Sequence, residues 1–110
     1  GENMADVPVQ KVTLSGLSPS FQAADSAGDS FVNDGKTILH FVNDDAVEKM
    51  VTVESVSKCN FGFDHDLTLT VPATSELKAG PFPTARFNAD GKVTIAYDDV
   101  TSLTVAAFQD

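Results

Sequence analysis

The chain has 110 residues and a formal net charge of -9 at pH 7, and 42% of its residues are hydrophobic. This length is typical of a single domain, and the apolar content is too high for a disordered chain. The excess of acidic side chains argues against nucleic acid or an anionic membrane as the main partner, because both carry negative charge. Cys59 is the only cysteine, which excludes an internal disulfide.

The N-terminal residues, GENMADVPVQ, contain neither the basic region nor the apolar core of a secretory signal. We interpret residues 1–3, which precede Met4, as an expression scar. Residues 1–9 are then scar plus an extended N-terminal arm, and residues 10–110 are one domain. Pro8 favours extended backbone, so we expect the arm to be able to add to the sheet of a neighbouring protein.

The first half of the chain predicts strands separated by polar turns. We expect a strand at 8–15, where proline and β-branched residues disfavour a helix, and a short second strand at 21–24. The stretch Asn-Asp-Gly at 33–35 favours a turn, because these residues tolerate positive φ. Residues 37–43, TILHFVN, are apolar on both faces, as in a central strand.

The middle of the chain continues this pattern. Residues 46–58 predict a strand, with a helix over 46–51 as the alternative. Val56 breaks the alternation of apolar and polar side chains there, which indicates a bulge near Ser55 or a twist of the strand. Residues 67–72, LTLTVP, show the clearest alternation in the chain.

The C-terminal part predicts strands at 84–88, 92–98 and 102–108, with a turn at 88–91. Seven or eight short strands, spaced about ten residues apart, result for the whole chain. This spacing predicts an all-β fold, an antiparallel β-sandwich that is jelly-roll-like or immunoglobulin-like.

The predicted core consists of the inward-facing side chains of these strands. Its members are Val12, Leu14, Phe31, Leu39, Phe41, Val51, Val53, Leu67, Leu69, Val71, Phe87, Val93, Ile95 and Val105. Packing two sheets is the way for strands this short to hide their apolar faces.

The stretch CNFGFDHD, 59–66, gathers residue types that bind metals. Cys59 and His65 lie six apart, without the paired spacing of a zinc site. On an extended segment Asp64 and Asp66 share one face, and His65 points to the other. We therefore expect a turn and a strand start there, with no metal ligand and no cofactor.

The sequence also lacks the context for catalysis. Cys59 as a nucleophile would need His40 or His65 as a base and a pair of oxyanion donors, which no motif supplies. We expect His40 to be a core or cross-strand histidine. The aspartate pairs at 44–45 and 98–99 resemble acid–base dyads, but they fall in turns, where aspartate is common. These observations predict no enzymatic activity and no catalytic residues.

Three stretches in order carry a resemblance: GDSFVNDGKTILHFVN, VTVESVSKCNFGFDHDLTLTVPA and AGPFPTARFNADGKVTIAYDDVTSLTVAAFQ. Together they resemble a family of small proteins from tailed-bacteriophage structural modules, similar to head decoration (cement) proteins, over nearly all of residues 10–109. The matching features are scaffold features, such as the Gly28-Asp29-Ser30 run, Val71-Pro72-Ala73 and Gly80-Pro81-Phe82.

The resemblance implies a bacteriophage virion structural protein, most specifically a capsid decoration protein that stabilises the head shell. It would be made in the bacterial cytoplasm and would act in the virion. Its partners would be the major capsid protein or other virion proteins, and a homo-oligomer is left open. The alternatives are a head–tail connector or tail component, and a carbohydrate-binding β-sandwich for surface attachment.

Overall fold

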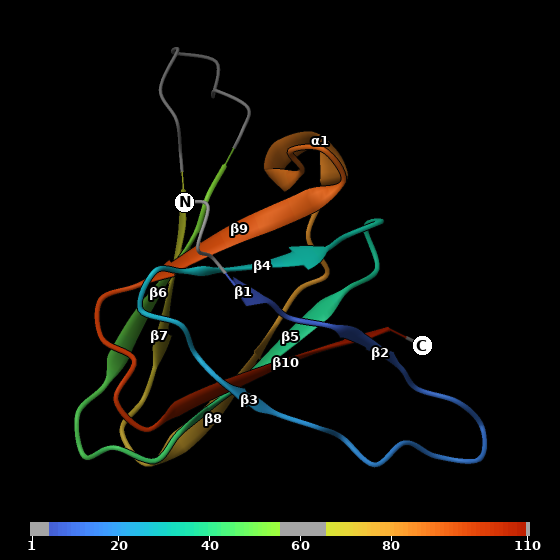
Figure 1. Ribbon diagram of the computed structural model, residues 1–110. Coiled ribbons are helices and arrows are strands. Elements are labelled where there is room, and N and C mark those ends of the chain that lie inside the picture. Colours follow the sequence, from blue (N-terminus) through green and yellow to red (C-terminus); the bar gives the residue numbers. More distant parts are fainter. Residues whose placement is uncertain (1–4, 56–65, 110) are drawn as a thin grey trace.

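The computed structural model describes residues 5–55 and 66–109, which form ten strands and one short helix (Figure 1). The elements are β1 (Ala5–Asp6), β2 (Val9–Lys11), β3 (Gln22–Ala23), β4 (Asp29–Val32), β5 (Ile38–Asn43), β6 (Lys49–Val53), β7 (Leu67–Val71), β8 (Ser75–Ala79), α1 (Thr84–Phe87), β9 (Lys92–Tyr97) and β10 (Leu103–Gln109).

The strands form two sheets that pack as a β-sandwich, which confirms the predicted fold class. The first sheet has the order β1-β4-β9-β6-β7, and the second has β2-β10-β5-β8, with β3 also paired to β10. The pairs β1–β4 and β2–β10 are parallel, and the others are antiparallel. Consecutive strands often lie in different sheets, so distant segments of the chain meet across the core.

Most of the predicted core is confirmed. The following side chains are buried: Phe31, Leu39, Phe41, Val51, Val53, Val71, Phe87, Val93, Ile95 and Val105. Leu67 and Leu69 are half-buried and pack against this core, because among the described strands β7 has a neighbour on one side only. The core also includes Phe82, whose ring lies against those of Phe31 and Phe87.

The predictions for Val12 and Leu14 are wrong. Strand β2 ends at Lys11, and the chain then leaves the sheet in a loop that places Val12 at 44% exposure and Leu14 at 106%. A turn causes the departure: the Gly16 amide donates to the Thr13 carbonyl at 2.9 Å, with Gly16 at a φ of 99°. The Val12 amide still donates to the Gln109 carbonyl at 2.6 Å. However, Val9 packs against the core, and Val12 lines the opposite face of the second sheet.

Three local predictions also change. The strand expected at 84–88 is the single helical turn α1, which begins after Pro83 and buries Phe87. Strands β4 and β8 form at segments to which the sequence analysis assigned no strand, because pairing in the sheets overrides weak local propensity. The helix alternative for 46–51 is wrong, since β6 alternates buried and half-buried residues over Lys49–Val53. Val56 lies outside the described residues.

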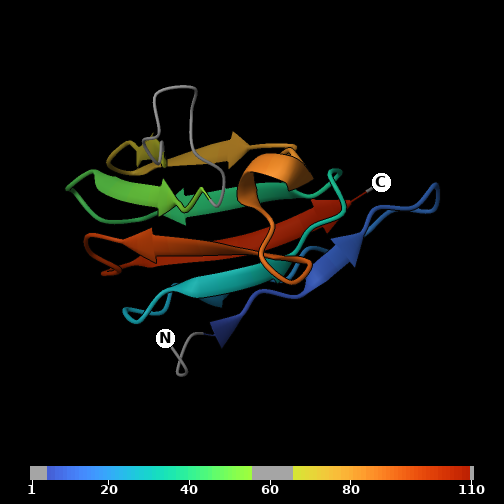
Figure 2. The same ribbon diagram turned by 90° about the horizontal axis from the view of Figure 1, so that it is seen from above.

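The N-terminal segment belongs to the sandwich, which corrects the expected boundary at residue 10. β1 pairs with β4 in the first sheet and β2 with β10 in the second. Val7 between them is 2% exposed, and its amide donates to the Ser30 carbonyl. Figure 2 shows β1 and β2 (blue) along one side of the sandwich and the yellow strands β7 and β8 along the other. The described part of the expected arm thus pairs with its own sheets.

Candidate functional site

An apolar groove of about 750 Å³ lies on the outer face of the second sheet, and we call it the outer groove. Strands β5, β8 and β10 supply its floor, and the loop between β2 and β3 supplies its wall. Its lining residues are Val12, Leu17, Pro19, Phe21, Ile38, His40, Val42, Glu76, Lys78, Phe108 and Gln109. An open, mainly apolar hollow with a few polar groups is the usual form of a binding site.

The floor of the groove follows from the two-faced character of β5. Leu39 and Phe41 point into the core and are fully buried, whereas Ile38, His40 and Val42 are half-buried on the opposite face. Because both faces of this segment are apolar, the sequence predicted a central strand. The structure shows that only one face is covered by the other sheet, and that the second face is the groove floor.

Three rings stand together in the groove. The Phe21 ring lies 5.1 Å from that of His40 at an interplanar angle of 78°, and 6.2 Å from that of Phe108. The His40 and Phe108 rings are 6.3 Å apart. Edge-to-face contacts of this kind stabilise aromatic pairs beyond their buried area. The cluster therefore fixes the shape of the groove floor.

Polar groups gather along the β8 side of the groove. His40 Nε2 lies 2.6 Å from Glu76 Oε1, and Lys78 is the direct cross-strand neighbour of His40. This confirms the prediction of a cross-strand histidine. The groove thus offers an apolar floor with one carboxylate and one ammonium at its rim.

The wall of the groove is held at its base by one side chain. The Gln10 amide donates to the Ser20 carbonyl at 2.7 Å, and its oxygen accepts the Ser20 amide at 2.9 Å. This pair of bonds joins the two ends of the loop, whose tip carries Leu14. Sequence analysis missed the site because Val12 and Leu14 were assigned to the core. An apolar run followed by Gly16 was the available signal for an exposed loop.

The lining of the outer groove combines apolar side chains with a few polar groups. None of its described lining residues carries a hydroxyl or thiol nucleophile. His40 and Glu76 contact each other at the rim, and the remaining surface is largely aliphatic and aromatic. The groove suits an apolar side chain or ring flanked by a charged group.

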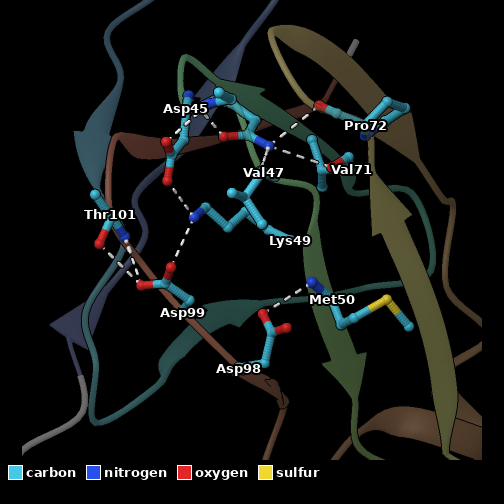
Figure 3. Close-up of polar contacts among 11 residues, drawn as sticks. Asp45, Val47, Lys49, Met50, Val71, Pro72, Asp98, Asp99 and Thr101 are labelled. Carbon is cyan, nitrogen blue, oxygen red and sulfur yellow. Dashed lines mark hydrogen bonds and ion pairs between the residues drawn. The ribbon is translucent and has the colours of Figure 1, made fainter.

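A second polar cluster surrounds Lys49 at one end of the sandwich (Figure 3). Its side chain is 0% exposed, and its ammonium donates to Asp45 and Asp99, at 2.7 Å each. Asp98 accepts the Met50 amide, as Figure 3 also shows. Three of the four aspartates of the two pairs therefore meet here: Asp45 and Asp99 at the Lys49 ammonium, and Asp98 at the start of β6.

The charges of this Lys49 cluster stabilise each other. The hydrogen bond from Lys49, with further bonds from Thr101, lowers the pKa of Asp99 to about 2. The same lysine and the Ala46 amide lower the pKa of Asp45, and both carboxylates raise the pKa of Lys49. The ion pairs hold two turns together, so the cluster is structural.

A buried carboxyl group lies in β4. Asp29 is fully buried; its Oδ2 accepts the Tyr97 hydroxyl at 2.6 Å, while Oδ1 has no partner within the described part of the chain. Burial raises the pKa of Asp29, and burial together with this bond raises the pKa of Tyr97. Neither group lines the outer groove.

The stretch 59–66 is described only at its last residue. Asp66 Oδ1 accepts the Ser55 amide at 2.7 Å, so this carboxylate joins the described residues on either side of the stretch. Cys59, Asp64 and His65 lie outside the described residues. Among residues 5–55 and 66–109, no group of three or more His, Cys, Asp or Glu side chains is placed to hold a metal ion.

Comparison of the chain with family models, curated proteins and solved structures found no match in any of the three. Within the described residues, no helix has the length and apolarity needed to cross a membrane.

Proposed function

We propose that this chain is a non-catalytic structural protein of a bacteriophage virion, specifically a capsid decoration protein that docks on the head shell through the outer groove. The observation that carries the docking role is the apolar groove beside a fully exposed Leu14, on a chain of net charge -9. Contiguous exposed apolar surface on a soluble domain marks an interaction site. The virion setting is supported by the sequence resemblance.

The geometry suits a protein partner. The groove is backed by a two-sheet core, so its shape is set before binding and little ordering entropy is lost. A partner that inserts an apolar side chain and surrounds it with basic residues would match both the groove and the acidic chain. Such a surface is expected where neighbouring major capsid proteins meet in the assembled shell.

Co-sedimentation with empty, expanded heads of the encoding phage tests this proposal. Val42→Lys places a charge on the groove floor, and Val47→Lys makes the same change at a valine that is 60% exposed outside the groove. We expect the chain and Val47→Lys to bind heads, Val42→Lys to lose binding, and none to bind isolated capsid subunits. No binding of the unaltered chain well above micromolar concentration, or equal binding of both variants, would overturn the decoration role.

Carbohydrate binding is the second candidate, because the three rings of the groove stand beside hydrogen-bonding groups of Glu76, Lys78 and Gln109. A glycan array separates the two functions. Glycan binding that disappears in Val42→Lys, together with no binding to heads, would favour surface attachment. A head–tail connector would instead show a stable ring of many copies in sedimentation.

A further inference from the structure

Strand β8 is an open edge of the second sheet. It pairs with β5 on one side, from Asn43–Ser75 to Leu39–Ala79, and no described strand pairs with its other side. The edge differs from the opposite end of this sheet, where β2 and β3 share the outer side of β10. An unpaired strand edge is a template for another strand.

The register shows which backbone groups of β8 face outward. The Asp44 amide donates to the Ser102 carbonyl, so Asp44 and every second residue before it in β5 bond toward β10. The alternate residues Asn43, Phe41 and Leu39 therefore bond toward β8, where their partners are 75, 77 and 79. The amides and carbonyls of Glu76 and Lys78 consequently point away from β5, toward the open edge.

The sequence of this edge, Ser-Glu-Leu-Lys-Ala, complements itself when reversed. In an antiparallel pair of β8 strands centred on Leu77, Glu76 of each copy lies opposite Lys78 of the other. Both of these are hydrogen-bonded pairs. The same register places the half-buried Leu77 opposite its equivalent, on the core side of the sheet. Centring the pair on Glu76 or on Lys78 would set like charges opposite each other, which destabilises strand pairing.

We propose that this chain forms a two-fold symmetric dimer by antiparallel pairing of β8 with β8 of a second copy, in the register centred on Leu77. The four outward amides and carbonyls of each strand's Glu76 and Lys78 are then bonded, and two Glu–Lys pairs cross the seam. The contact is isologous and closes at two copies, because each open β8 edge is used once.

The dimer has a consequence for the outer grooves. Glu76 and Lys78 line the groove of each copy, so the seam lies between the two grooves. The two-fold axis stands perpendicular to the joined sheet, and both grooves open on the same face. A dimer would thus present two equal sites to a symmetric surface, which raises overall affinity by effective concentration. The dimer itself does not depend on the proposed docking role.

Sedimentation equilibrium of the full chain, over a range of concentrations at physiological ionic strength, tests the dimer. We expect a monomer–dimer equilibrium whose heavier species has twice the 11.6 kDa mass of the chain. Lys78→Glu and Glu76→Lys each set like charges opposite one another, and each should weaken association by about tenfold or more. The double variant Glu76→Lys/Lys78→Glu restores opposite charges at both pairs and should restore the dimer.

Lys36→Glu is the matched control, because it makes the same charge change at an exposed lysine outside β8. It should leave the association constant unchanged. Hydrogen exchange of the Glu76 and Lys78 amides gives a second readout, since protection at high concentration should vanish in Lys78→Glu. A monomer at every concentration, a dimer unaffected by Lys78→Glu, or a double variant that stays monomeric would each overturn the proposal.

Discussion

The two faces of β5 consist of similar residues but differ in how far they are buried. The inner face, with Leu39, Phe41 and Asn43, is fully buried between the sheets. The outer face, with Ile38 and Val42, stays half-exposed in the groove. Apolarity alone does not distinguish them, since each residue would gain from burial. What differs is whether this chain itself covers the face, and an uncovered apolar face is available to a partner.

Alanine substitutions on the two faces of β5 should differ most in their effect on the free energy of unfolding. Phe41→Ala removes a ring from the closed core and should cost about 3–5 kcal/mol of unfolding free energy. Val42→Ala, on the adjacent residue, should cost about 1 kcal/mol or less, because its side chain is already partly in water. Urea denaturation of both variants measures the difference. Equal costs would mean that the outer face is also covered in the free protein.

Removing the Asn43 side chain, at the polar end of the inner face, should lower the free energy of unfolding by a smaller amount. Asn43 Nδ2 lies within bonding distance of the carbonyls of Val47, Val71 and Pro72, at 3.0, 3.3 and 3.1 Å, and its Oδ1 accepts the Asp45 amide. Asn43→Ala leaves these groups without their partner and should cost about 1–3 kcal/mol. Asn43→Asp offers a control, since it keeps the acceptor and loses the donors. An alanine variant as stable as the parent would show that water replaces the amide.

Acid titration should give the smallest effect, because Asp45 and Asp99 are partly exposed and solvent screens their ion pairs. Their folded-state pKa values are lowered, so their stabilisation is full above the unfolded pKa near 3.8 and is lost as pH falls toward the Asp99 pKa of about 2. Asp29 acts in the opposite sense, because its folded-state pKa is raised. Its contribution to stability is full below the unfolded pKa near 3.8 and is lost as pH rises through the folded-state pKa.

Two variants separate these contributions in melting curves between pH 2 and pH 7. Lys49→Met should flatten the acid limb that Asp45 and Asp99 produce, because it removes their common partner. Asp29→Asn should raise the melting temperature at neutral pH, since it removes the carboxyl charge at a buried position. An acid limb that is unchanged in Lys49→Met would place its origin outside the Lys49 cluster.

The sequence by itself determined the fold class and most of the core, because alternation in segments such as 67–71 and 92–97 directly reflects the pleat of a strand. It also indicated that 37–43 is a central strand and that His40 lies across from another strand. These are local properties, because they depend on residues that are close together in the sequence.

Only the tertiary structure decided where the sandwich is open. Whether Val12 and Leu14 are buried depends on which face of β2 meets the other sheet; Val9 packs against the core, so Val12 lies on the outer face, and the turn at Gly16 leaves Leu14 in solvent. The Lys49 cluster joins Asp45 to Asp99, which are far apart in the sequence. The groove and the open edge of β8 likewise arise from which strands end up side by side. Contacts of this range depend on the path of the whole chain, and residue periodicity does not record them.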